Sequence, residues 1–261
     1  MKIVIVGSGW LGKPLAEKMW NLGHDVFAIY RSNKPMVSCA IAKAIDDTRS
    51  AIELIQSNDL DMLKMKLPHA DAVVFCFPSP KEGKSHAEVC LDITQYCDPS
   101  CRFIFTSTTG VYPNENAEFD EQSILDPENK HVQTENQLRR ELGNTLSIVR
   151  LAGLVGEGRF PVRMMSSSGK IYNADEYCNL IHLEDAVGFI AFLILENIRV
   201  EIVNACAPQH PAKGEYYTDM AEKLNVATPV FEKGPTGKLI LSDLSISLGY
   251  EYLKPDPYDF Y

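Results

Sequence analysis

The chain lacks the long apolar run that a membrane span requires. Of its 261 residues 45 % are hydrophobic, yet no segment reaches the roughly 18–20 apolar residues needed to cross a bilayer. The first apolar run, residues 3–6, breaks at Gly7 and is too short for the core of a signal peptide. We therefore expect a cytoplasmic protein with no membrane partner.

The sequence also lacks a cysteine framework and an excess of basic charge. Its seven cysteines are odd in number and form no Cys-x-x-Cys pair, which favours reduced, packed thiols over disulfides or a metal site. Its 35 acidic residues outnumber 25 basic ones and leave a net charge of −10. Because such a chain repels phosphate backbones, we expect no nucleic-acid partner and a small molecule as substrate.

What the sequence does contain is a regular alternation of short apolar runs and amphipathic segments. The run at 72–77 is apolar throughout, as in a strand buried on both faces of a parallel sheet. The pattern predicts strands at 2–6, 25–30, 72–77, 103–105 and 146–149, helices at 11–22, 85–96 and 132–142, and a further strand at 40–45. This alternation predicts an α/β fold, a Rossmann-type doubly wound parallel sheet.

After about residue 155 the alternation loosens. Glycines and a proline predict a loop at 156–161, and the polar stretch 164–170 precedes a helix at 183–195, a strand at 201–204 and a helix at 216–224. We therefore predict a dinucleotide-binding domain at 1–155 and a smaller C-terminal α+β substrate lobe at 156–261, packed on it with an intertwined boundary. The aromatic end, with Tyr258, Phe260 and Tyr261, fits either a partner subunit in a homodimer or the chain's own core.

The turn after the first predicted strand reads G-x-G-x-x-G and opens a helix. In this context the first glycine permits the tight turn, the second lets the backbone approach a pyrophosphate, and the third lets helix and strand pack closely. The N–H groups and dipole of the helix start attract the negative charge. We assign a dinucleotide cofactor to the six residues of this loop: Gly7, Ser8, Gly9, Trp10, Leu11 and Gly12.

The end of the second predicted strand indicates which dinucleotide the loop holds. A carboxylate there binds the ribose 2′-hydroxyl of NAD, whereas an arginine accommodates the 2′-phosphate of NADP. The strand ends in Tyr30-Arg31-Ser32, with no acidic residue at that point. Arg31 and Ser32 therefore favour NADP, although Arg31 as a solvated surface charge leaves NAD open.

Taken with three further segments, the glycine loop resembles the extended and atypical short-chain dehydrogenases/reductases, the NAD-dependent epimerase/dehydratase family. These segments are a Ser/Thr-rich strand ending in Val111-Tyr112, a run at 149–156, and a His-x-x-Asp helix start at His182 and Asp185, followed by a similar tail at 238–257. The resemblance implies that His182 and Asp185 orient the helix they begin. It also places five residues beside the cofactor: Phe77, Thr106, Ser107, Leu151 and Gly153.

The chain departs from that family at its acid/base centre. The family's Tyr-x-x-x-Lys pair is missing: if Glu135 matches the glutamate that follows the lysine, the tyrosine position is Pro127 and the lysine position is His131. The candidates for catalysis are then Thr108, whose match in the family orients the substrate, the phenol of Tyr112, and the imidazole of His131, which can donate to a hydroxyl.

Two functions are consistent with this departure. The chain is either an NADP-preferring oxidoreductase, epimerase or dehydratase that acts on a sugar-like or other small carbonyl substrate, or a catalytically silent dinucleotide-binding sensor or regulator. The vacant Pro127 and His131 positions support the sensor, whereas the Ser/Thr strand and the second lobe support the enzyme.

Overall fold

The computed structural model describes residues 1–31 and 52–261; the predicted strand at 40–45 and the site residue Ser32 lie outside these ranges. The chain forms two compact units. Unit 1 comprises Met1–Ser107, Lys130–Val149 and Val187–Ile202, and unit 2 comprises Thr108–Asn129, Arg150–Ala186 and Val203–Tyr261. The sequence suggests an intertwined boundary near residue 155, and in the structure the chain passes repeatedly between the units, because it leaves the sheet for unit 2 and returns to complete it.

The centre of the fold is a seven-stranded parallel sheet, which confirms the predicted fold class. Its order is β11-β7-β5-β4-β1-β2-β3, and β1 pairs in parallel with both β2 and β4. The strand order therefore reverses at β1, which is where open α/β sheets bind ligands at their carboxyl edge. The strands are β1 (Lys2–Val6), β2 (Asp25–Tyr30), β3 (Glu53–Gln56), β4 (Ala72–Phe75), β5 (Arg102–Thr108), β7 (Leu146–Leu151) and β11 (Ile202–Ala205).

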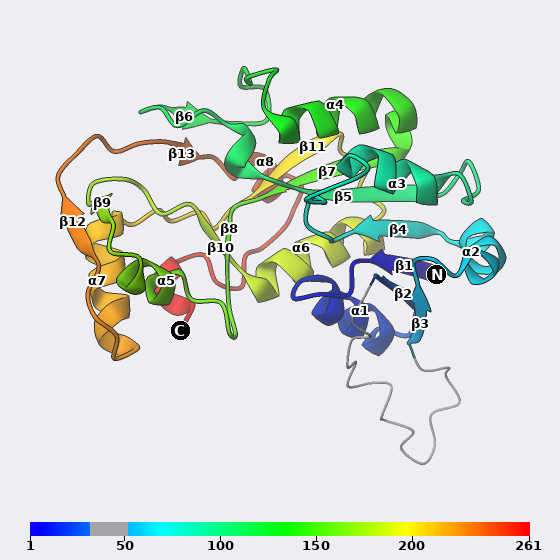
Figure 1. Ribbon diagram of the computed structural model, residues 1–261, viewed down its shortest axis with the longest axis horizontal. Helices are drawn as coiled ribbons and strands as arrows, with labels where there is room; N and C mark the ends of the chain where they lie inside the picture. The colour runs from blue at the N-terminus through cyan, green and yellow to red at the C-terminus, as the bar shows by residue number, and fades with distance from the viewer. Residues whose placement is uncertain (32–51) are drawn as a thin grey trace, which may run out of the picture. The chain divides into compact units, whose positions relative to one another are not determined.

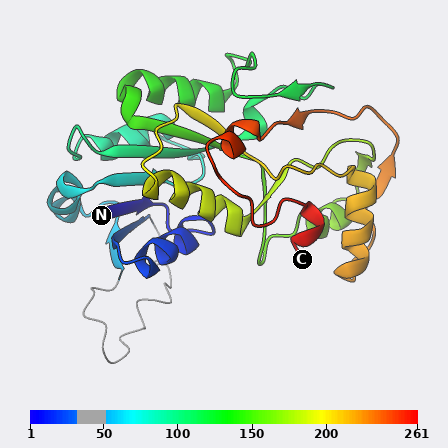
Figure 2. The same ribbon diagram turned by 180° about the vertical axis from the view of Figure 1, so that it is seen from behind.

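Helices cover both faces of the sheet in unit 1 (Figures 1 and 2). One face carries α3 (His86–Thr94) and α4 (Lys130–Leu142), and the other carries α1 (Gly12–Asn21) and α6 (Leu183–Leu195). The shorter helices are α2 (Leu60–Lys66) and the 3₁₀ turns η2 (Leu67–His69) and η4 (Gly143–Thr145). Successive strand residues face opposite sides, so both sides of β1 and β4 are buried, as the continuous apolar runs predict.

Two local interactions fix helix ends in unit 1. Ser85 and Glu88 form a capping box at the start of α3: the Ser85 hydroxyl accepts from Glu88 N at 3.2 Å, and Glu88 Oε2 accepts from Ser85 N at 2.7 Å. The buried guanidinium of Arg102 donates to the carbonyls of Leu193, at 2.6 Å, and Ile198, at the end of α6. Burial, with a smaller effect of Arg199, lowers the pKa of Arg102 to about 10.

Unit 2 consists of small parallel sheets and short helices. β8 (Gly153–Val155) pairs with β10 (Leu180–His182), β9 (Ile171–Asn173) with β12 (Val230–Glu232), and β6 (Glu118–Phe119) with β13 (Leu239–Ile240). Its other elements are α5 (Pro161–Ser167), α7 (Lys213–Lys223), α8 (Asp243–Ser247), η3 (Thr109–Val111) and η5 (Pro257–Asp259). The sequence does not predict a helix at α5. Its serines make the segment look polar, although Val162 and Met165 are buried.

The aromatic end of the chain packs within unit 2. Phe260 is buried, the Tyr261 ring lies 5.0 Å from that of Phe160, and the Tyr258 ring lies 5.3 Å from that of Tyr216. Phe260 and Tyr258 therefore contribute to the core of unit 2, whereas Tyr261 is exposed.

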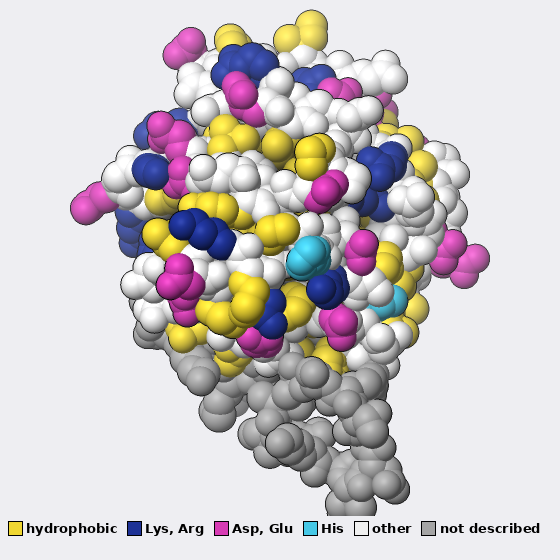
Figure 3. All heavy atoms as spheres, turned by 90° about the vertical axis from the view of Figure 1, so that its right-hand side faces the viewer, with side chains coloured by type: hydrophobic (Ala, Val, Ile, Leu, Met, Phe, Trp, Pro, Cys, Tyr) yellow, Lys and Arg dark blue, Asp and Glu magenta, His cyan; other side chains and the backbone are white. Residues whose placement is uncertain are grey.

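On the face that Figure 3 shows, basic, acidic and apolar side chains are interspersed, and no large patch of a single charge sign is seen there. In the parts of the chain that the structure describes, no helix is both long and apolar enough to cross a membrane.

Candidate functional site

The three glycines of the loop after β1 occupy three different environments. Gly7 has a φ of +95°, and an added Cβ would lie 2.7 Å from Phe77 Cβ. A Cβ on Gly12 would lie 2.1 Å from Gly7 O, so only glycine lets α1 start this close to the turn. Gly9 is exposed, and its Cβ would have no neighbour within 4 Å. These are the geometries that a tight turn, close helix packing and an open approach for a ligand require.

The remaining loop residues surround this open position. Ser8 and Trp10 are half-buried, and Leu11 is buried where α1 begins. Arg31 follows the carboxyl end of β2 and is exposed. The loop and Arg31 thus lie at the carboxyl ends of adjacent parallel strands, where sequence analysis places the cofactor.

Beside the loop, Phe77 covers a buried histidine that sequence analysis missed. The His86 ring lies 4.7 Å from the Phe77 ring and 5.0 Å from the Phe105 ring, both edge-on. Its Nε2 is buried and has no hydrogen-bond partner within the described part of the chain. Burial, with a smaller effect of His131, lowers the pKa of His86 to about 4, so this imidazole is neutral near pH 7.

The end of β5 contacts α4 through a short hydrogen bond. Ser107 Oγ donates to Oε1 of Glu135 at 2.5 Å, and Glu135 is buried. Thr106 Oγ1 donates to Phe75 O at 2.8 Å and ties β5 to β4. His131 lies one turn before Glu135 on α4 and is exposed.

Thr108 and Tyr112 belong to unit 2, at the turn that follows β5. Thr108 Oγ1 accepts from Gly110 N at 3.0 Å, so its hydroxyl hydrogen is left for another acceptor. The Tyr112 hydroxyl accepts from Arg150 Nη1 at 2.9 Å and donates to Asn204 Oδ1 at 2.8 Å. Burial raises the pKa of this phenol. Tyr112 is therefore buried in a polar network, which favours positioning the turn over donating a proton to a ligand.

Leu151 and Gly153 also lie in unit 2, at the end of β7 and the start of β8. Leu151 is buried, whereas Gly153 is exposed, and a Cβ there would lie 2.9 Å from Leu180 Cδ2. Asp185 is buried and accepts from Tyr250 Oη, Leu253 N and Lys254 N at 3.0, 2.7 and 3.0 Å. These contacts tie the start of α6 to the C-terminal segment; the predicted orienting of the helix by Asp185 stays a prediction.

The structure thus brings together in unit 1 the glycine loop, Phe77, Ser107 and the neighbouring residues of α3 and α4. Sequence analysis missed His86 because a histidine one residue after a capping serine looks like a surface residue. It also missed the Tyr112–Arg150–Asn204 network, because these residues come from three distant segments. Among residues 1–31 and 52–261, no group of three or more His, Cys, Asp or Glu side chains is placed to hold a metal ion.

A dinucleotide diphosphate fits the loop on its own geometry. The open space over Gly9 and the closed contacts at Gly7 and Gly12 leave one place where a ligand can approach the backbone. No carboxylate stands after β2, since that position holds Arg31.

The fold and this site define the chain as a Rossmann-fold protein that shares the fold of known NAD-dependent epimerases/dehydratases. Within that class it belongs to the family of the Escherichia coli (strain K12) protein YeeZ, to which it is 34 % identical over 98 % of this chain and 97 % of YeeZ. No protein-family model matches the chain.

Solved structures share the fold at lower identity. A Methylobacillus flagellatus protein assigned to the NAD-dependent epimerase/dehydratases superposes with a TM-score of 0.78 at 20 % identity, over 100 % of this chain and 96 % of that one. Human epimerase family protein SDR39U1 (isoform 2), solved with NADPH, gives 0.72 at 16 %, over 98 % and 96 %. UDP-glucuronic acid 4-epimerase from Bacillus cereus, solved with NAD, gives 0.73 at 19 %, over 98 % and 93 %.

Proposed function

We propose that the protein is a nicotinamide-dinucleotide-dependent oxidoreductase or epimerase that acts on a small carbonyl or hydroxyl substrate and prefers NADP. The observation that carries this proposal is the difference between the three loop glycines. An added Cβ would collide with neighbouring atoms at Gly7 and Gly12, whereas at Gly9 it would meet open space. The neighbours SDR39U1 and UDP-glucuronic acid 4-epimerase were solved with NADPH and NAD respectively, which supports this class of cofactor.

The chain's own residues have distinct roles in this proposal. Backbone N–H groups of the loop and the start of α1 bind the diphosphate, and Arg31 binds the 2′-phosphate. Phe77 packs beside the loop, and its backbone lies so close to Gly7 that no side chain fits between them. The bound cofactor would supply or accept a hydride at the substrate carbon.

Thr108 and His131 take the polar roles that remain. The Thr108 hydroxyl already accepts from Gly110 N, so it is oriented to donate its hydrogen to a substrate oxygen. His131, on the first turn of α4, donates to a ribose hydroxyl in place of the family's lysine. Tyr112 positions the turn that carries Thr108 through its bonds to Arg150 and Asn204.

A carbonyl panel that includes nucleotide sugars and 2-oxo acids tests this proposal, with NADPH oxidation followed by its near-ultraviolet absorbance. We expect turnover of at least one class, and a loss of about a hundredfold in kcat for Thr108→Ala. Thr218→Ala is the matched control, because this exposed hydroxyl bonds only to Gly214 O of its own helix. Equal rates for Thr108→Ala and wild type would remove Thr108 from the mechanism.

The second candidate, a dinucleotide-binding sensor without turnover, is favoured by one observation. The phenol of Tyr112, the tyrosine nearest the Ser/Thr strand, is already bonded on both sides by Arg150 and Asn204. A sensor would bind NADPH with wild-type affinity in Thr108→Ala and would oxidise it with no member of the panel.

A further inference from the structure

Unit 2 holds a half-buried lysine next to the turn that carries Thr108. Lys238 Nζ donates to the carbonyl oxygens of Tyr112 at 3.2 Å and Thr109 at 3.4 Å. Both carbonyls belong to the short segment that follows β5 directly along the chain. The ammonium therefore lies at the turn that directly follows Thr108, although Lys238 is more than a hundred positions away in the sequence.

The backbone around Lys238 is fixed on both sides. Asn179 Nδ2 donates to Lys238 O at 2.9 Å, and Asn179 Oδ1 accepts from Ile240 N at 2.9 Å. The next residue starts β13, whose Leu239 N donates to Ala117 O at 2.9 Å. The side-chain amide and the strand pairing thus hold the main chain at Lys238, and the two carbonyl oxygens hold its ammonium.

The charge of Lys238 is not neutralised by a carboxylate. Within residues 1–31 and 52–261, its ammonium forms no ion pair with an Asp or Glu oxygen. The carboxylate that acts on it most strongly, that of Glu176, forms an ion pair with Lys213 instead. Burial, and after it the charge of Lys213, lowers the pKa of Lys238 against the opposing effect of Glu176.

Glu176 thus pairs directly with Lys213, and it acts on Lys238 only without a direct contact. An ammonium has three N–H donors, and two of them are used by the carbonyls of Thr109 and Tyr112. The third donor and the uncompensated charge suit an oxygen that carries negative charge.

We propose that Lys238 is a substrate-binding residue that holds an oxyanion, a carboxylate or phosphate group of the substrate, beside Thr108. This assignment rests on the proposed function in that it names the substrate class of the same lobe. It implies that the substrate is an anionic carbonyl compound. Lys238 would be a cation of the substrate lobe, in a chain that lacks the lysine of the family's Tyr-x-x-x-Lys pair.

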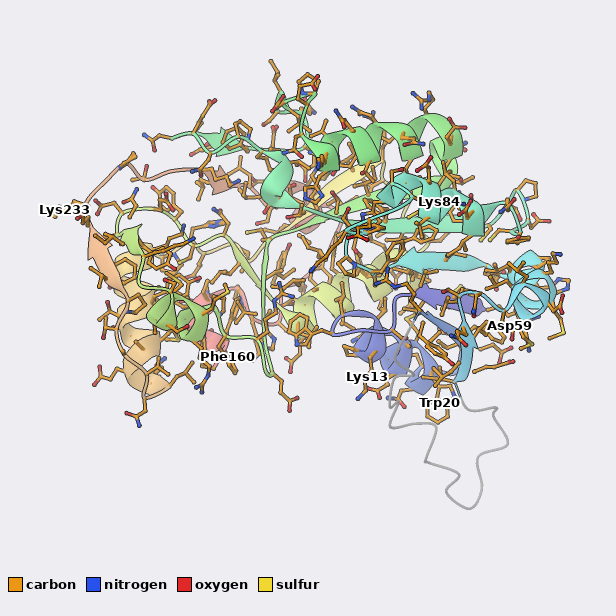
Figure 4. The ribbon with its side chains drawn as sticks, viewed as in Figure 1. Lys13, Trp20, Asp59, Lys84, Phe160 and Lys233 are labelled. Atoms are coloured by element: carbon orange, nitrogen blue, oxygen red, sulfur yellow. The ribbon has the colours of Figure 1, made fainter. Side chains whose placement is uncertain are left out.

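Side-chain NMR of labelled lysines tests this assignment without turnover. Oxalate and inorganic phosphate are titrated separately into the full-length protein, and the Lys238 Cε signal is identified by its loss in Lys238→Met. We expect this signal to shift saturably with at least one anion; oxalate alone would indicate a carboxylate and phosphate alone a phosphate group. Lys233, five residues earlier and exposed at the edge of Figure 4, is the control whose signal shifts little.

The variants separate this inference from the proposed function. Lys238→Met should weaken anion binding by about tenfold or more, the loss of one charge-assisted contact, while NADPH affinity and the Lys233→Met control stay at wild-type values. Should Lys238→Met unfold, the wild-type titration together with Lys238→Arg, which keeps the charge, decides the question. Absence of a saturable Lys238 shift with both anions, or an equal shift at Lys233, overturns the assignment; loss of NADPH binding in wild type overturns the proposed function.

Discussion

Ser107 Oγ and Glu135 Oε1 lie 2.5 Å apart and join the carboxyl end of β5 to the middle of α4. Glu135 lies one helical turn after His131, and its partner Ser107 is the residue directly before Thr108. Since the pair is shielded from water, leaving either partner of this contact without the other is costly. The contact holds the strand end and the helix in the arrangement that the candidate site needs.

Removing this acceptor should destabilise the protein more than neutralising it. Glu135→Ala leaves the Ser107 hydroxyl without its partner and creates a cavity, and we expect a loss of about 2–4 kcal/mol in the free energy of unfolding. Glu135→Gln keeps an oxygen that accepts from Ser107 and should cost clearly less. Urea unfolding measures both variants, and equal midpoints for the two would contradict the role given to this bond.

Substitutions at two glycines of the loop should affect stability and ligand binding differently. Gly12→Ala would bring a Cβ to 2.1 Å from Gly7 O, and we expect it to lower the free energy of unfolding by about 3 kcal/mol or more. Gly9→Ala meets no atom within 4 Å and should leave stability within about 1 kcal/mol of wild type. Its methyl group occupies the approach to the backbone, so NADPH affinity should fall by about tenfold or more.

Thermal denaturation and calorimetry with NADPH check this pair of variants. If Gly9→Ala binds NADPH like wild type, the ligand does not approach the backbone at Gly9. If Gly12→Ala is as stable as wild type, the tight contact between loop and helix is not what holds the turn.

His86 should make stability depend on pH. Its pKa lies at about 4 in the folded protein, below the ordinary value of 6.5, so between these values the unfolded chain binds more protons. The stability that neutral His86 contributes is therefore present above pH 6.5 and is lost as the pH falls towards 4.

The free energy of unfolding of wild type and His86→Leu, measured from pH 7 to pH 4.5, checks this prediction. The difference, wild type minus variant, should shrink as the pH falls. His69→Leu, a matched change at an exposed position of the same unit, should keep a constant difference. A difference for His86→Leu that also stays constant would mean that His86 does not titrate in this way.

Asp185 should anchor the C-terminal segment of unit 2. Its carboxylate accepts from Tyr250 Oη and from the N–H groups of Leu253 and Lys254. In Asp185→Asn one oxygen becomes an amide donor that faces other donors, and we expect a loss of about 2–3 kcal/mol with faster proteolysis near residue 253. Glu184→Gln, at the exposed neighbouring position, should be cleaved at the wild-type rate; equal cleavage of both variants would contradict the anchoring role.

The sheet of unit 1 was predictable because its strands carry their own signal. Strand 25–30 and the helix at 183–195 agree with β2 and α6 residue for residue, since the interior of each is buried and made of apolar residues. β3 and α2 were not predicted, because Glu53–Gln56 is half polar and α2 buries only Leu63. The paired strands of unit 2 are two or three residues long, too short for a period to appear.

The candidate site was predictable where one segment carries the chemistry and not where tertiary contacts create it. The glycine loop and its flanking strand and helix form one continuous segment, from Lys2 to Asn21. The environment of Tyr112 depends on Arg150 and Asn204, and that of Lys238 depends on the turn at Thr109. No local pattern marks these pairs, because their partners are brought together only by folding.

Isothermal titration calorimetry of wild-type protein with NADPH and with NADH tests the central claim most directly. We predict saturable binding of one nucleotide per chain, tighter for NADPH, with the preference reduced in Arg31→Ala. Binding of neither nucleotide would contradict the view that the loop between β1 and α1 is built to receive a dinucleotide.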